Sequence, residues 1–252
     1  MSIYNKHNYI NKAFDYIPSA NIKEYDIKSA GFNILIAKGL LSQEQIEHLE
    51  ELPKERRNIE IGLMQKNNKE LSKARNEGLK EYRKKFFEAN GLDSESVISI
   101  KSDAIFVVNK PIKYTRFDNI LFRQKNKYSS YYRINNIELY FSKRDNKLDV
   151  KGINDLDLSK HKHFMSFLKK IIKLNEISNS SARNYLYDFA DRYRKLMLPI
   201  DYYREFKSGG AFRLKQTLEF AHFETDIIDD KDELNIAYNY VNIIIPLIKM
   251  IY

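Results

Sequence analysis

The chain of 252 residues contains no cysteine, and its apolar runs are short. The lack of cysteine excludes disulfide bonds, thiolate zinc sites and cysteine nucleophiles. The longest apolar run, "IIIPLI" at residues 243–248, is too short to cross a bilayer, and the first residues hold no continuous apolar stretch of the signal-peptide kind. We therefore expect a cytoplasmic protein with no membrane partner.

The charge is unbalanced toward the positive side. Lys and Arg together number 43 against 34 Asp and Glu, which gives a formal net charge of +9. Such a balance favours a polyanionic partner such as nucleic acid. The abundance of Lys, Asn, Ile and Tyr is also what AT-rich coding DNA produces, so the charge alone leaves both explanations open.

The middle of the first half is predicted to be helical. Residues 42–52 have the pattern of a helix capped by Ser42, with Gln45 at the capping-box position. Pro53 begins a second helical stretch, and a long basic helix then runs to a stop at Gly91.

The following residues change to a strand pattern. Residues 97–151 are rich in β-branched and aromatic residues separated by polar breaks, and the first part, "VISIKSDAIFVV", is typical of a β-hairpin with a polar tip. Helical patterns return from about residue 160. This order predicts an α+β fold with a mostly antiparallel sheet, a helical insertion and a helical C-terminal region.

Two acidic residues lie between apolar strands. Asp26 ends a β-like run before a turn of small residues, and Asp103 lies at the tip of the predicted hairpin. Asp26 either caps the next helix or forms half of a metal site, and Asp103 either shapes the turn or forms the other half. Two carboxylates converging at a sheet edge are the minimum needed to clamp the two divalent ions of nucleotidyl transfer.

The residues around both acids resemble the motifs of family B DNA polymerases. "DIKSAGFNIL" has the layout of motif A, roughly D-x-x-S-L-Y-P-S-I-I, and "IKSDAIFV" resembles motif C, x-D-T-D-S-I-F-V. Further on, "KNKYSSYY" looks like the basic segment that holds the primer terminus, and "KLDVKGI" looks like the segment that follows it. The four segments occur in the family's order between residues 24 and 153.

The resemblance implies a polymerase palm-like sheet made of residues 1–41 and 92–158. Residues 42–91 would be a basic, fingers-like insertion, and residues 159–252 a thumb-like helical region. The short segment before Asp26 leads us to expect no proofreading exonuclease domain. The implied activity is template-directed nucleotidyl transfer by a small DNA polymerase or primase-like enzyme of a phage or mobile element, acting on primer–template DNA and nucleoside triphosphates, with replication proteins as further partners.

The resemblance also implies a metal site. Asp26, the backbone carbonyl of Ile27 and Asp103 would hold two Mg²⁺ or Mn²⁺ ions. Lys101 takes the catalytic position at which the family has a further aspartate. A cation there either weakens metal binding or contacts a phosphate in place of an acid.

Other residues are implied to contact the substrates. The nucleotide-binding candidates are Ile27, Ser29, Gly31, Phe32, Arg56, Arg57 and Lys66. The nucleic-acid-binding candidates are Lys125, Lys127, Tyr128 and Lys151, together with Lys80, Arg83 and Lys84 of the basic helix, which form either a phosphate-facing surface or a solvated face. Gly31 replaces the bulky tyrosine with which the family excludes a 2′-hydroxyl, so a ribose would meet no side chain there.

Two other kinds of function stay open at this point. One is a non-catalytic nucleic-acid-binding relic of a palm, or an accessory subunit of a polymerase. The other is a structural or inhibitory protein without a nucleic-acid role. Divalent-ion binding separates the polymerase from the relic, and salt-sensitive DNA binding separates both from the structural protein.

Overall fold

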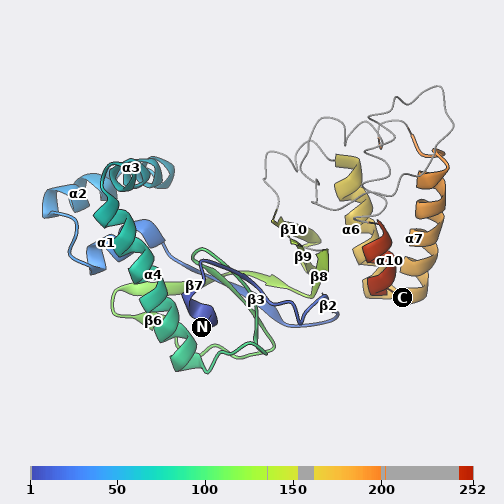
Figure 1. Cartoon of the computed structure of the whole chain (residues 1–252), viewed down its shortest axis with the longest axis horizontal. Helices are drawn as coiled ribbons and strands as arrows, with labels where there is room; N and C mark the ends of the chain where they lie inside the picture. The colour runs from blue at the N-terminus through green and yellow to red at the C-terminus, as the bar shows by residue number, and fades with distance from the viewer. Residues whose placement is uncertain (1, 135, 153–161, 200–201, 203–243, 252) are drawn as a thin grey trace. The chain divides into compact units, whose positions relative to one another are not determined.

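The computed structural model describes residues 2–134, 136–152, 162–199, 202 and 244–251 (Figure 1). The chain divides into two compact units. The first comprises Met1–Ala13 and Ala20–Lys127, and the second comprises Phe14–Ser19 and Tyr128–Tyr252. Each unit has its own sheet and its own core.

The first unit is built on a six-stranded sheet with strand order β1-β4-β5-β3-β7-β6. The strands span Asn8–Ile10 (β1), Ile22–Ile27 (β3), Val97–Lys101 (β4), Ala104–Val108 (β5), Arg116–Phe117 (β6) and Ile120–Tyr128 (β7). The pairs β1/β4, β4/β5, β3/β5 and β6/β7 run antiparallel. The strand that ends with Asp26 and Ile27 therefore lies inside the sheet, between β5 and β7.

The helices of the first unit include those that the sequence predicts between residues 42 and 91. They span Ile3–Asn5 (η1, a 3-10 helix), Ala30–Ala37 (α1), Gln43–Glu51 (α2), Lys54–Asn67 (α3) and Lys69–Asn90 (α4). The predicted capping box is confirmed, because Ser42 and Gln45 each accept a hydrogen bond from the other's backbone N–H. The predicted stop at Gly91 is also confirmed, since this residue ends α4 with a left-handed φ of 59°.

The main core of the first unit lies between α4 and the sheet. It contains Tyr25, Ile27, Leu79, Tyr82, Phe86, Phe87, Ile100, Ile105 and Phe122 among others. The rings of Phe86 and Phe122 stack at a centroid distance of 4.3 Å. A separate, smaller apolar cluster of Phe32, Leu35, Leu41, Leu49 and Ile61 joins α1, α2 and α3.

One glycine sets the distance between α1 and α4. A Cβ atom at Gly78 of α4 would collide with Cγ2 of Ile34 in α1, and Ile34 is fully buried. The absence of a side chain at residue 78 therefore lets the two helices pack directly on one another.

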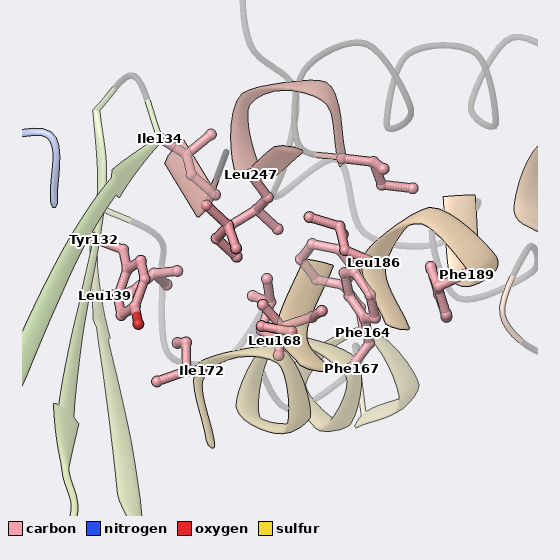
Figure 2. Packing of buried hydrophobic residues seen from close by; sticks show 14 of the residues in the cluster. Tyr132, Ile134, Leu139, Phe164, Phe167, Leu168, Ile172, Leu186, Phe189 and Leu247 are labelled. Carbon is pink, nitrogen blue, oxygen red and sulfur yellow. The ribbon is translucent and has the colours of Figure 1, made fainter. Parts of the chain in front are cut away.

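The second unit contains a four-stranded antiparallel sheet with order β10-β9-β8-β2. Its elements are Tyr16–Ile17 (β2), Ser130–Ile134 (β8), Ile137–Ser142 (β9), Lys147–Lys151 (β10), Lys162–Ile177 (α6), Asn179–Arg194 (α7) and Ile245–Ile251 (α10). Figure 2 shows side chains from the sheet and from α6, α7 and α10 pointing into one core. The rings of Phe167 of α6 and Phe189 of α7 stack in this core with a centroid distance of 3.9 Å.

The predicted α+β class and the antiparallel pairing are confirmed. The boundaries of the two units differ from those of the three predicted domains. These were a sheet domain of residues 1–41 and 92–158, an insertion of residues 42–91 and a C-terminal region of residues 159–252. The helices of residues 42–91 belong to the first unit because α4 packs on its sheet, whereas residues 128–151 pair with β2 in a second sheet that packs on α6 and α7. Among the helices in the described ranges, none is long and apolar enough to span a membrane.

Candidate active site

Asp26 and Asp103 lie on neighbouring strands of the first sheet. Asp26 is opposite Ala104 where β3 pairs with β5. Asp103 directly precedes Ala104, in the two-residue turn between β4 and β5. Ser102, the other turn residue, has a φ of 55°, as tight hairpin turns require. Both acids line one cavity of about 430 Å³, so the structure brings these two sequence-predicted residues together.

Asp26 does not cap the helix that follows it. The N-cap residue of α1 is Ser29, which has a φ of 48° and makes no side-chain capping bond. Asp26 is only 7% exposed and accepts two hydrogen bonds from Arg123, at 2.7 Å from Nε and 3.2 Å from Nη2. Of the two explanations that the sequence leaves open, helix capping is therefore excluded.

A second cation of β7 lies beside this pair. Nζ of Lys125 is 3.9 Å from Oδ2 of Asp26 and 3.7 Å from Oε1 of Glu24. The amide of Asn126 donates to the other oxygen of Glu24 at 2.5 Å. Glu24 and Asp26 are two residues apart on β3 and so face the same side of the sheet. Cations of β7 thus neutralise the acidic side of β3, and an amide of the same strand donates a hydrogen bond to it.

The surroundings of Asp103 disfavour the ionised form of its carboxyl group more than they favour it. Burial raises the pKa of its carboxyl group, and the negative charge of Asp26 raises it further. A hydrogen bond from its own backbone N–H and the charges of Arg75 and Lys125 act in the opposite direction on this pKa. The two acids in the cavity therefore repel one another, and the neighbouring cations offset part of this repulsion.

We expect the free energy of unfolding of the Asp103→Asn variant to exceed that of the wild type at neutral pH. The folded-state pKa of Asp103 lies above its unfolded value, so its contribution to stability is present below the unfolded pKa and is lost as the pH rises through the folded pKa. Urea unfolding at several pH values should show the two chains converging in acid and separating as the pH rises.

The control is Asp118→Asn, since the exposed Asp118 is paired with Lys85 and has a lowered pKa. This change should not stabilise the chain at neutral pH. An Asp103→Asn chain no more stable than the wild type would contradict the electrostatic description of the cavity.

The opposite wall of the cavity comes from α3 and α4. Lys54, Asn58, Gly62 and Gln65 of α3 line it, and Arg75 of α4 completes it. The α3 residues are spaced by three or four positions and therefore share one helix face. The sequence analysis did not predict these wall residues, because it chose Arg56, Arg57 and Lys66 of the same helix as candidates. Counting the helical period from Lys54 would have identified the residues that line the cavity.

Only some of the predicted nucleotide-binding residues line the cavity. Ile27, Ser29 and Gly31 line the cavity, whereas Phe32, Arg56, Arg57 and Lys66 are not among the described residues that form its wall. Phe32 is 4% exposed within the α1–α3 cluster, and the guanidinium of Arg57 lies 5.2 Å from its ring centroid. Arg57 thus packs on the cluster instead of lining the cavity, and its contact with a nucleotide stays a prediction.

Gly31 lies where α1 approaches the opposite wall. A Cβ atom at this position would be 3.3 Å from Cγ2 of Ile61 and 3.8 Å from Nε of Arg75. A side chain at residue 31 would therefore enter the narrow space beside Ile61 and Arg75, which line the cavity together with Gly31. Lys101 ends β4 opposite Asn8 and Ala104 and is not among the described residues lining the cavity.

The prediction that Arg83 contacts nucleic acid is corrected, because this residue is 1% exposed. Its Nη1 donates to the carbonyl oxygens of Lys6, at 2.5 Å, and Ser102, at 3.3 Å. Burial lowers the pKa of Arg83 to about 10, against the raising effect of Asp103. Arg83 therefore holds the turn that carries Asp103 from within the core.

The other nucleic-acid candidates divide between exposed and buried positions. Lys80, Lys84 and Lys127 are exposed, and Lys151 is half-buried at the end of β10. Tyr128 is 2% exposed, and its hydroxyl donates to Asp149 at 2.7 Å. The prediction that Tyr128 lies along a nucleic-acid strand is corrected, since a ring packed beside Tyr140 is not available for that contact.

The donor set fits a divalent ion that brings part of its own coordination shell. In the part of the chain that the structure describes, no three His, Cys, Asp or Glu side chains gather as a metal site. Asp26 and Asp103 are two carboxylates in one cavity, and Mg²⁺ accepts one or two carboxylates when substrate phosphates complete its shell. Asp26 and Asp103, with the carbonyl of Ile27, are the groups that could hold such an ion.

Comparison with known proteins places the chain in one family. The family model described as Bacteriophage PBS1 gene 130 protein matches residues 1–252, so the chain belongs to this family. No curated protein matches the sequence.

Proposed function

We propose that this chain is a metal-dependent, template-directed nucleotidyltransferase, a small phage DNA polymerase or primase-like enzyme. The observation that carries the proposal is the cavity of the first unit, where Asp26 and Asp103 from adjacent strands face a wall of cationic and amide side chains. In this proposal the six-stranded sheet is a polymerase palm, α2 to α4 act as fingers, and the helices of the second unit act as the thumb.

Each wall of the cavity has its own task in this mechanism. Bound divalent ions would activate a primer 3′-hydroxyl and stabilise the leaving pyrophosphate. Asp26 and Asp103 would hold these ions, and Arg83 fixes the turn that carries Asp103. Lys54, Arg75 and Lys125 bind the polyphosphate, since Lys and Arg donate charge-assisted hydrogen bonds to phosphate oxygens.

The amide groups of Asn58 and Gln65 add neutral hydrogen-bond donors and acceptors along the same wall. They orient a bound nucleotide without adding charge. The sugar would lie beside Gly31, which adds no side chain to the cavity wall.

The test is primer extension by the full chain. We expect extension of a labelled primer on a DNA template with deoxynucleoside triphosphates and Mg²⁺ or Mn²⁺. Binding of the triphosphate is measured beside it by calorimetry. A chain that extends no primer with either metal would refute the proposal.

One observation favours a second candidate, a non-catalytic palm relic that binds nucleic acid. Both oxygens of Asp26 are engaged by Arg123, and Lys101 replaces a further acid of the family B motif. A relic binds primer–template in a salt-dependent manner but extends no primer with either metal, so the extension assay separates the two candidates.

Nucleic-acid binding by α4 is testable on its own. We expect the double variant Lys80→Glu/Lys84→Glu to weaken DNA binding and to flatten its salt dependence, because both side chains are exposed on the same helix. Each lost phosphate contact should lower the slope of log K against log salt by about 0.9 for duplex DNA. Fluorescence anisotropy at several salt concentrations measures this slope.

The matched control is Lys69→Glu/Lys73→Glu, which changes the net charge equally and keeps the four-residue spacing on the same helix. An equal fall of the slope in both double variants indicates a general charge effect. An unchanged slope in the Lys80/Lys84 variant means that this part of α4 is a solvated face.

A further inference from the structure

Arg123 occupies the carboxylate that a metal ion would need. Its guanidinium makes a two-pronged contact with Asp26, one prong to each oxygen, at 2.7 and 3.2 Å. This fork-like geometry is the strongest arrangement available between an arginine and a carboxylate. Asp26 therefore offers no unengaged oxygen to an ion while Arg123 stays in place.

The contact between Arg123 and Asp26 is partly open to solvent. The side chain of Arg123 is 42% exposed, whereas that of Asp26 is 9% exposed. The arginine thus reaches in from the open side of the cavity. It can leave Asp26 without unpacking the core.

The balance of charge in the cavity decides which ligand can displace Arg123. Lys54, Arg75, Arg123 and Lys125 line the cavity against the two acids, Asp26 and Asp103. With four positive and two negative side chains in its wall, the cavity has a net positive charge, which repels a bare divalent cation. The same groups attract a polyphosphate, and a displaced guanidinium finds there a new set of anionic oxygens in bidentate reach.

We infer that Arg123 is a positioning residue that guards the metal site, holding Asp26 until a nucleoside triphosphate arrives and then transferring to its phosphates. The divalent ions consequently enter with the triphosphate and not before it. This inference rests on the proposed nucleotidyl transfer. It concerns the order in which ligands enter, which is measurable without any turnover.

The experiment compares two ligands on the full chain. One is Mn²⁺ alone, followed by electron paramagnetic resonance of the free ion. The other is dATP with a methylene bridge between its α and β phosphates, added with Mn²⁺ and followed by calorimetry. The variants are Arg123→Gln, Arg123→Lys and, as a control on the neighbouring strand β6, the exposed Arg116→Gln.

We expect one substitution to shift the two affinities in opposite directions. Arg123→Gln should bind Mn²⁺ alone about tenfold more tightly than the wild type and the metal–triphosphate analogue about tenfold more weakly. Arg123→Lys should bind Mn²⁺ alone with an intermediate affinity, because an ammonium cannot engage both oxygens of Asp26. Arg116→Gln should match the wild type on both ligands, and adding Asp26→Asn to Arg123→Gln should abolish the gain in Mn²⁺ affinity.

Several results would overturn the inference. Wild-type chain that binds Mn²⁺ alone as tightly as Arg123→Gln shows that Arg123 guards nothing. A parallel loss of both affinities in Arg123→Gln and Arg123→Lys assigns Arg123 a purely structural role. Opposite shifts without primer extension by the wild type leave the guarding role intact and refute only the transferase.

Discussion

Replacing either Asp26 or Asp103 by Asn is expected to lower nucleotide incorporation by about a thousandfold or more. Under the proposed function each change removes a metal ligand, and a thousandfold corresponds to about 4 kcal/mol of transition-state stabilisation. DNA binding should stay close to that of the wild type, since neither change removes a phosphate-binding cation. Single-nucleotide extension and anisotropy measurements on the same samples check both halves of this expectation.

Two features of the cavity sharpen this experiment. Asp118→Asn is the control, because Asp118 is exposed and outside the cavity wall. Asp103→Asn is also expected to be the more stable chain at neutral pH, so a loss of incorporation cannot be blamed on unfolding. Incorporation that survives both substitutions would place the chemistry elsewhere in the protein.

The second large effect concerns the sugar of the incoming nucleotide. Wild-type chain should use ribonucleotides and deoxyribonucleotides within about tenfold of one another, a difference of about 1.4 kcal/mol, because Gly31 presents no side chain. Gly31→Tyr should reject ribonucleotides by about a hundredfold or more and spare deoxyribonucleotides. Incorporation assays with matched ribo- and deoxynucleoside triphosphates measure the ratio.

The surroundings of Gly31 set the controls. Gly31→Ala tests the backbone position, since a Cβ there lies 3.3 Å from Ile61 and requires only a small adjustment. Phe32→Ala tests the neighbouring ring, which is buried and packed under Arg57. A strong wild-type preference for deoxyribonucleotides that disappears in Phe32→Ala would make Phe32 the selective residue, and a preference that survives it would refute the alignment of this corner with motif A.

Local signals in the sequence predicted local structure well. The capping box of Ser42 and Gln45, the stop at Gly91 and the polar tip at Ser102 and Asp103 all depend on residues within a few positions of one another. Such features follow from side-chain capping and from backbone conformation, which operate at short range. The antiparallel α+β arrangement followed from the order of these elements.

Long-range pairing could not be predicted in the same way. Arg123 and Asp26 are separated by 97 positions, and nothing near either residue announces the contact. The change of sheet at Tyr128 also has no local signal, because it depends on which helices cover which strands. Arg83 looked like one more cation of a basic helix, and only the helix packing shows that its side chain points into the core.

The close contact between Gly78 and Ile34 has a mechanical consequence. Because the side chain of Ile34 packs directly on the backbone of Gly78, we expect α1 and α4 to move as one body with the sheet on which α4 packs. The α2–α3 pair is attached through the smaller cluster around Phe32 and Ile61, against which Leu71 of α4 also packs. We expect any closure on a substrate to hinge at this smaller cluster, so that α3 carries Lys54 and Gln65 toward the acids while Arg75 stays with α4 and the sheet.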